Sequence, residues 1–281
     1  MLGERAAGVE GIGRIVGVDA GLVVIDKPAG LTSHDVVARL RRILRTRKIG
    51  HAGTLDPMAT GVLVCGVERG TKLLGHLALD TKAYTATIRL GAATTTDDAE
   101  GEVVSTADPT AVTDAAVAAG VAALTGAIQQ VPSSVSAIKV DGKRAYALVR
   151  AGEEVALPPR PVVVSAFEVL ARDLGAALGV GGHLTALRRT RVGPFTLAHA
   201  RTLEALETAP SLSLTLDEAV SVAFPRRDAD PAEAADLAHG RPLPPAGVEG
   251  VQGVFAPDGH VLALVRDRDG RARPVVVLAP A

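Results

Sequence analysis

The fold is decided by one stretch of the sequence, Lys48-Ile49-Gly50-His51-Ala52-Gly53-Thr54-Leu55-Asp56-Pro57-Met58-Ala59-Thr60-Gly61-Val62-Leu63. Three glycines, a proline and two threonines surround a single carboxylate, Asp56, so we expect the backbone to turn tightly and approach another segment closely. The apolar run Val62 to Val67 follows at once and predicts a buried strand. Asp56 is therefore a candidate reactive carboxylate on a stiff loop. The alternative is that it only closes an Asx turn before Pro57.

A basic amphipathic helix precedes this stretch. Thr32 to Asp35 offers N-cap chemistry, and we expect the helix to run to about Arg45. Its apolar stripe is formed by Val36, Val37, Leu40, Ile43 and Leu44. The cations that lie off the stripe, with no acid among them, are Arg39, Arg41, Arg42, Arg45, Arg47 and Lys48. They predict either a phosphate-binding surface or an ordinary solvated helix face.

Charge is informative only locally. The chain has 30 basic and 31 acidic residues and a net charge of −1, so its total charge does not indicate nucleic-acid binding. A second cationic cluster contains Arg188, Arg189, Arg191 and Arg201. Because phosphate binding follows the local field, we name Arg39, Arg42, Arg45, Lys48, Arg188 and Arg189 as candidate contacts to a phosphate backbone.

The remaining pattern predicts an α+β fold with a mixed sheet. We expect strands at 21–28, 82–90, 135–140, 161–170 and 183–191. Helices are predicted at 71–77, 112–124, 143–150 and 171–178, and a polar loop at 91–101. From Phe224 onward, a short helix capped by Asp230-Pro231 and several Val/Leu strands predict a small β-rich domain.

Composition excludes several classes of protein. Apolar residues make up 47% of the chain, which excludes disorder, and no apolar run is long enough to span a bilayer. Cys65 is the single cysteine, so an internal disulfide is impossible. With no secretion-signal pattern, we expect a cytoplasmic protein. Two Tyr, four Phe and no Trp argue against a base-stacking platform for single strands.

No nucleotide or metal motif is present in the sequence. The glycine-rich phosphate-binding and dinucleotide-binding patterns are missing, and the seven His show no metal-ligand spacing. We therefore expect no cofactor and no metal. A lone carboxylate then leaves nucleophilic or acid–base chemistry.

Four blocks of sequence resemble the TruB family of tRNA pseudouridine synthases. They are Val24 to Val37, the Asp56 loop, Lys82 to Gly101, and Gln130 to Tyr146; Leu184 to Thr190 also matches. The resemblance implies a pseudouridine synthase catalytic domain over residues 21–223, after a loose arm over 1–20. Residues 224–281 occupy the place of the family's small RNA-binding C-terminal domain.

The resemblance also implies a reaction. Uridine-55 in the T-loop of tRNA would be flipped out of its stack and isomerised to pseudouridine after attack by Asp56. His51 would fill the space that the flipped base leaves, Tyr84 would stack on the base, and Leu187 would line its pocket. Without the resemblance, His51 reads as a loop hydrogen-bonder, and Tyr84 and Leu187 as core residues. The implied partner is the T-arm of tRNA, bound by a monomer without a membrane or a protein partner.

One departure from the family is clear. Members carry a Gly-Thr-Tyr-Ile-Arg strand whose Tyr contacts substrate and whose Arg pairs with the catalytic carboxylate. Here Phe167 to Leu170 runs straight into Ala171-Arg172-Asp173-Leu174-Gly175, so the block is missing. Arg172 matches a helix position, and we assign no arginine as catalytic. Two hypotheses follow: an active enzyme that compensates for the loss, or a tRNA-binding or tRNA-folding protein with impaired catalysis. A small-molecule enzyme fits poorly with the arginine-rich helix.

Overall fold

The computed structural model describes residues 19–77, 81–130, 139–140, 143–144, 157–158, 160–164 and 171–279. Most of the predicted N-terminal arm (1–20) lies outside the described residues. So do most of the Gln130–Tyr146 block, residues 145–150 of the predicted helix at 143–150, and residues 165–170 of the predicted strand at 161–170.

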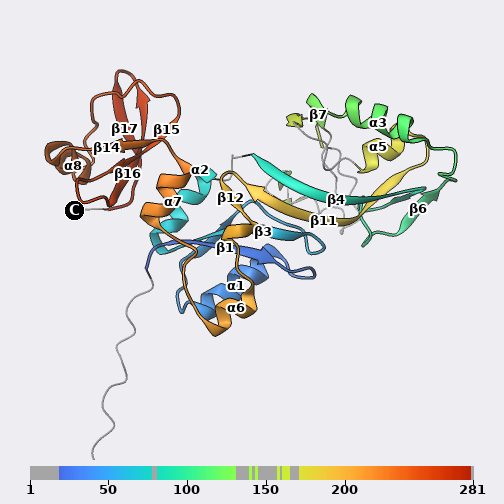
Figure 1. Cartoon of the computed structure of the whole chain (residues 1–281), viewed down its shortest axis with the longest axis horizontal. Coiled ribbons are helices and arrows are strands. Elements are labelled where there is room, and N and C mark those ends of the chain that lie inside the picture. Colours follow the sequence, from blue (N-terminus) through green and yellow to red (C-terminus); the bar gives the residue numbers. More distant parts are fainter. Residues whose placement is uncertain are drawn as a thin grey trace, which may run out of the picture.

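The centre of the molecule is a seven-stranded mixed sheet (Figure 1). Its main path runs β12-β11-β3-β1-β13, with β2 added to β3 and β4 added to β11. The strands are β1 (Gly21–Lys27), β2 (Ile49–Ala52), β3 (Thr60–Val67), β4 (Lys82–Leu90), β11 (Gly182–Val192), β12 (Phe195–Thr196) and β13 (Leu214–Thr215).

Two strands share one edge of β3. β2 pairs antiparallel with the second half of β3, whereas β11 pairs parallel with its start, through Arg188↔Thr60 and Arg189↔Gly61. Gly61 has a φ of +96°, and a Cβ atom there would lie 2.1 Å from the carbonyl oxygen of Arg189. Only glycine permits this approach. The loop between β2 and β3, which carries Asp56, therefore lies at the point where β11 joins β3.

Both faces of β3 are buried, which explains its continuous apolar run. Val62 and Val64 belong to one core cluster, and Leu63, Cys65 and Val67 to another. Helix α1 (Ser33–Ile43) packs Val36, Val37 and Leu40 into the second cluster, together with α6 (Leu203–Thr208). Figure 1 shows both helices on the same face of the sheet. A capping box between Thr32 and Asp35 fixes the start of α1.

Strands β4 and β11 extend as a long antiparallel pair away from the sheet centre (Figure 1). Smaller elements accompany them: β5 (Ala92–Thr94), β6 (Val103–Thr106), α3 (Asp114–Ala123), β7 (Gly126–Gln130), β8 (Lys139–Val140), β9 (Lys143–Arg144), β10 (Arg160–Val164) and α5 (Ala171–Ala177). On β4, Thr85, Thr87 and Arg89 are exposed and the intervening residues are less so, as the predicted alternation requires.

A separate four-stranded sheet, ordered β14-β15-β16-β17, forms the C-terminal part. It contains β14 (Arg226–Asp228), α8 (Pro231–Ala238), β15 (Val251–Phe255), β16 (Val261–Arg268) and β17 (Arg271–Val277). The remaining short helices belong to the earlier part of the chain: η1 (Glu68–Leu73), α2 (Leu74–Leu77), η2 (Leu197–His199) and α7 (Leu216–Ala223). One face of the four-stranded sheet packs on α8 around Val254 and Val265. The other face shares a core with Val220 of α7 and with the large sheet.

Two local predictions were wrong, and a third was wrong in its first two residues, the only ones of that segment that the structure describes. Residues 49–52 form β2 where we expected only loop, because pairing with β3 satisfies their backbone groups. The polar loop at 91–101 contains β5, which pairs with β6. The predicted helix from Lys143 begins instead with β9, paired with β8 across the Asp141-Gly142 turn sequence.

We predict that Leu63→Ala lowers the free energy of unfolding by about 2–5 kcal/mol, because Leu63 is fully buried and alanine leaves a cavity. Val104→Ala is the control, since Val104 is 62% exposed, and it should change the value by less than about 0.5 kcal/mol. Urea titration measures both. Equal effects would contradict the assignment of β3 to the core.

Candidate active site

Asp56 lies on the loop between β2 and β3, next to buried anchors. Leu55 is 4% exposed and Ala59 is fully buried, whereas Asp56 itself is open to solvent. The Asp56 carbonyl accepts a hydrogen bond from the Ala59 N–H at 3.1 Å. In the part of the chain that the structure describes, the Asp56 carboxylate accepts no hydrogen bond. It therefore forms no Asx turn there, and the group is available for other chemistry.

The surroundings of Asp56 disfavour its ionised form. Neighbouring protein atoms displace part of its water, and this burial raises the pKa of Asp56 above its usual value. The nearby carboxylate of Asp98 raises the pKa further, and the ammonium of Lys27 opposes both effects. Asp98 is itself held in place by the Thr96 hydroxyl (2.5 Å) and the Glu100 N–H (2.9 Å). Perturbed carboxylates of this kind cluster at functional sites.

Lys27, at the end of β1, is a buried cation beside the loop. Its side chain is completely buried, and its Nζ donates to the carbonyls of Pro28 (3.0 Å), Leu31 (2.5 Å) and Pro57 (3.2 Å). Burial lowers the pKa of Lys27, while the negative charge of Asp56 opposes that change. Lys27 thus fixes the chain directly after Asp56 and places positive charge near its carboxylate.

Arg189 corrects one of our predictions. We expected it to contact an RNA backbone, but it is only 1% exposed and cannot reach a phosphate from this position. Its guanidinium donates to three carbonyls, those of Val62 (Nε, 2.7 Å), Gly53 (Nη2, 3.0 Å) and Thr54 (Nη1, 3.4 Å). A β-bulge between Arg189 and Arg191 interrupts the regular alternation of side chains, so Arg191 is exposed although Arg189 is buried.

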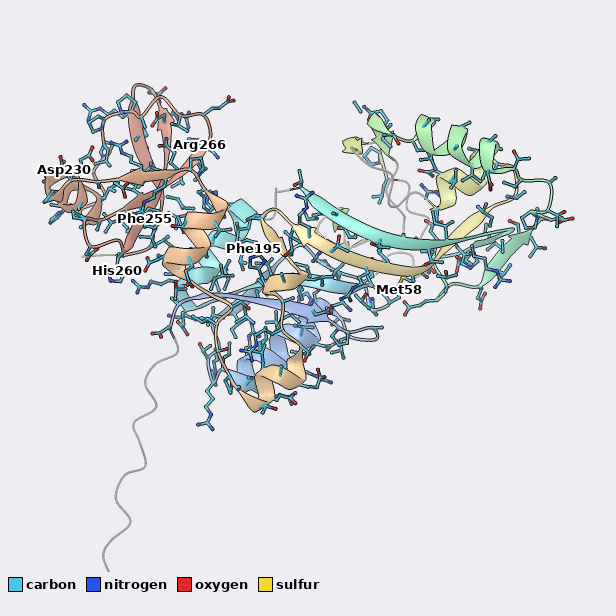
Figure 2. The ribbon with its side chains drawn as sticks, in the orientation of Figure 1. Met58, Phe195, Asp230, Phe255, His260 and Arg266 are labelled. Atoms are coloured by element: carbon cyan, nitrogen blue, oxygen red, sulfur yellow. The ribbon has the colours of Figure 1, made fainter. Side chains whose placement is uncertain are left out.

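Two of the three predicted substrate-binding residues border a core cluster to which Leu55, the residue before Asp56, also belongs. Tyr84 on β4 and Leu187 on β11 both pack, partly buried, against the cluster that contains Leu55. His51 lies on β2 opposite Cys65, and its ring contacts that of His34 edge-on at 5.5 Å between centroids. Figure 2 labels Met58, two residues after Asp56, close to β11.

The predicted RNA-backbone cations differ in their surroundings. Arg42 and Arg45 are exposed and Arg39 is half-buried, all on or just after α1. Lys48 is 76% exposed and 3.6 Å from Glu68. Arg188 forms a bidentate pair with Asp26, at 3.0 and 2.7 Å, so much of its charge is already neutralised. The helix presents the more accessible positive charge.

Arg172, on α5, contacts the turn that carries Asp97. It pairs with Asp97 at 3.3 Å and with Asp173 at 3.0 Å. Asp97 in turn belongs to a turn that β11 holds, since the Leu184 N–H donates to the Asp97 carbonyl at 3.0 Å. Through these contacts Arg172 helps to hold the loop that carries Asp98, and we assign it no catalytic role.

Sequence reasoning missed Lys27 as a site residue. Its signal was a lysine that ends an apolar run, immediately before Pro28. In the described residues, no cluster of three or more His, Cys, Asp or Glu side chains could hold a metal ion. None of the described helices has the length and apolar character needed to cross a membrane.

Three family models match the chain. One, described as TruB family pseudouridylate synthase (N terminal domain), matches residues 41–178. A second, described as tRNA Pseudouridine synthase II, C terminal, matches residues 224–279. The third, described as tRNA pseudouridylate synthase B C-terminal domain, matches residues 169–221.

Curated relatives match almost the whole chain. It is 61% identical to the tRNA pseudouridine synthase B of Rhodococcus jostii (strain RHA1), over 94% of this chain and 95% of the relative. It is 60% identical to that of Nocardia farcinica (strain IFM 10152), over 99% and 98%. The latter alignment spans 305 positions against 281 residues here, so at least 24 have no counterpart in this chain.

Solved structures share the fold. A crystal structure of a Cbf5-Nop10-Gar1 complex matches with a TM-score of 0.69 at 23% identity, covering 92% of this chain and 85% of that one. The archaeal box H/ACA sRNP Nop10-Cbf5 complex matches with a TM-score of 0.64 at 25% identity, covering 94% and 88%.

We predict that Asp56 titrates above the usual range of an aspartate and that Asp98→Asn lowers its pKa, because the substitution removes a neighbouring negative charge. Carbon-detected NMR of the side-chain carboxyl measures this directly. Glu102→Gln, an exposed change on the same loop, is the control and should leave the titration unchanged. An unshifted Asp56 titration in Asp98→Asn would contradict the electrostatic description of the site.

Proposed function

The chain belongs to the TruB family of tRNA pseudouridine synthases, and from this premise we propose how its own residues isomerise uridine-55 of tRNA to pseudouridine. Asp56 is the nucleophile that attacks the flipped nucleoside. The bond from the ribose to N1 breaks, the uracil rotates, and a bond to C5 forms; the C5 proton is lost and N1 gains one. The reaction is an isomerisation and consumes no co-reactant.

The observation that carries this proposal is the Asp56 carboxylate, which accepts no hydrogen bond from the described residues although its loop is anchored. A nucleophile must have its oxygen free, and its loop must hold it in one orientation. Asp56 meets the first requirement, and the contacts of Lys27 and Arg189 with Pro57, Gly53 and Thr54 support the second. The raised pKa of Asp56 implies that the reactive carboxylate forms only as the pH rises through that value.

Three side chains complete the proposed substrate site. Tyr84 stacks on the flipped uracil and Leu187 lines its pocket, since both border the apolar cluster next to Leu55. His51 fills the space in the RNA that the base leaves. Arg39, Arg42, Arg45, Lys48 and Arg188 are proposed phosphate contacts. Arg188 reaches RNA only through exchange of its partner Asp26.

Lys27 offers a partial substitute for the arginine that the family's missing strand would supply. Its ammonium stabilises the ionised form of Asp56 through space, as its effect on the Asp56 pKa indicates. The contact differs from the family arrangement because the Nζ hydrogen bonds go to carbonyl groups. We propose that the chain is active in this altered form. No observation favours the alternative, an impaired tRNA-binding protein.

We propose that the protein acts as a cytoplasmic monomer on the T-arm. We also keep the proposed division into an arm (1–20), a catalytic domain (21–223) and an RNA-binding C-terminal domain (224–281).

The C-terminal sheet has a surface suited to RNA, which we call the arginine face. It consists of Arg266, Arg268, Arg271 and Arg273, all exposed. The register places Arg266 opposite Arg273 and Arg268 opposite Arg271, so like charges face each other across the strands. Such like-charge pairs are unfavourable by themselves; Asp269 lies 3.5 Å from Arg268 and offsets part of that charge, and an anion beside Arg266 and Arg273 would offset more. We propose that this anion is the phosphate backbone of the bound tRNA.

The arginine face continues toward the catalytic domain. Arg266 lies on the side of the sheet near α2 (Figure 2). Burial is the main cause that lowers the pKa of His76 on that helix, and the positive charge of Arg266 lowers it further. Leu264 and Phe255, on the same face of the sheet, pack against α7.

We predict that Asp56→Asn abolishes turnover while binding persists, because the amide cannot act as the nucleophile but preserves the shape of the loop. Single-turnover pseudouridine formation should fall at least about 1,000-fold, with the dissociation constant of an unmodified T-arm transcript within about twofold. Asp236→Asn, an exposed carboxylate on α8, is the control. Product from Asp56→Asn would contradict the proposed nucleophile. Tight binding without product from the wild-type chain would support the impaired alternative.

We predict that Arg271→Gln combined with Arg273→Gln weakens tRNA binding and lowers the slope of log affinity against log salt by about 1 to 2, since each lost phosphate contact removes slightly less than one unit. Filter binding across a salt series measures the slope. Arg241→Gln, an exposed arginine just after α8 that pairs with Asp236 at 3.2 Å, is the matched control. An unchanged slope in the double variant would show that the arginine face does not contact RNA.

A further inference from the structure

Buried polar side chains are rare in the described residues, and half of them gather at one loop. The buried ones are Lys27, Ser33, Thr94, His183, Arg189 and Gln252. Three of the six, Lys27, Ser33 and Arg189, donate hydrogen bonds to carbonyl groups between positions 53 and 57. Burying polar groups is costly unless they are satisfied, so their convergence on the loop of Asp56 demands an explanation.

Ser33 holds the residue directly before Asp56. Its hydroxyl accepts a hydrogen bond from the Leu55 N–H at 2.9 Å and donates one to the Leu55 carbonyl at 3.1 Å. The Leu55 side chain is buried as well. The carbonyl of Leu55 belongs to the peptide group that leads into Asp56, so fixing that carbonyl fixes the plane from which Asp56 projects.

Arg189 holds the two residues before that. Through Gly53 and Thr54 it ties the loop to β11, and through Val62 to the strand that follows the loop. A planar guanidinium with several donors in fixed directions suits this task, whereas a lysine ammonium offers no such fork. Ser33 and Arg189 come from different elements, α1 and β11, so the loop is held from two sides.

We infer that Ser33 and Arg189 are positioning residues for Asp56, which set the orientation of its carboxylate without contacting substrate. The inference rests on the proposed function. Ser33 is the first residue of α1, but Thr32 already supplies the cap, so the Ser33 hydroxyl is not needed to begin the helix. A misplacement of a reacting group by about 1 Å costs on the order of 100-fold in rate.

The test is Ser33→Ala, assayed by single turnover on the T-arm transcript with enzyme in excess. We expect the rate constant to fall about 10- to 100-fold and the dissociation constant to stay within about twofold. The acidic limb of the pH–rate profile should stay in place, because Asp98 and Lys27 are unchanged. Only the plateau value of the rate constant at higher pH should fall.

Ser213→Ala is the matched control. The Ser213 hydroxyl accepts a hydrogen bond from the Val24 N–H at 3.0 Å, in the same sheet but away from Asp56. This variant loses a similar backbone contact, so a general loss of stability would appear in both variants. Its rate constant should stay within about twofold of the wild type.

Arg189→Lys provides a second variant, with Arg227→Lys as its control. Arg227 is also largely buried and donates to Pro244 and Glu233 in the C-terminal part. Arg189→Lys should reduce the rate constant at unchanged binding, whereas Arg227→Lys should not. If Arg189→Lys does not fold, Ser33→Ala alone decides.

A wild-type rate for Ser33→Ala would overturn this inference while leaving the proposed function intact. Equal losses of rate and binding would overturn it too, since they indicate damage to the RNA-binding surface. Absence of product from the wild-type chain would overturn the proposed function, and the positioning role with it.

Discussion

The structure depends on the close approach of β11 to the start of β3. The carbonyl of Arg189 lies where any side chain at position 61 would have to be, so Gly61 is required for the two strands to pair. That pairing brings the Arg189 guanidinium beneath the Asp56 loop and brings Leu187 to the cluster around Leu55. The site is therefore a product of the sheet topology. A loop that was free at this position could not keep a carboxylate both unbonded and oriented.

Elements with a clear period could be predicted from the sequence. β1, β3, β4 and α1 lie where the apolar pattern places them, since burial on one or both faces determines which residues are apolar. β11 also lies where we expected a strand, at 183–191, but its bulges break the alternation of side chains, so the burial of Arg189 was not predicted. β2 was missed because its two small residues and short length carry little pattern, and its partner β3 supplies its stability.

The candidate site was only partly visible in the sequence. Asp56 stands out because of the glycines and proline around it, and the family resemblance gives it a role. Ser33 reads as part of a helix cap, and nothing in the sequence indicates that its hydroxyl faces Leu55 across the fold. The absence of the family's arginine can be seen in the sequence. The sequence does not predict, however, that Lys27 lies close enough for its charge to act on Asp56.

The contacts that hold Asp56 also impose an order of assembly. Arg189 lies more than a hundred positions after the loop that it secures, whereas Ser33 and Lys27 precede that loop. The entropic cost of closing this long segment must be met before the Arg189 contacts can form. On the ribosome, Asp56 emerges long before β11 is synthesised. A nascent chain thus holds this loop only through Ser33 and Lys27, and it gains the contacts of Arg189 only when β11 has been made and has docked.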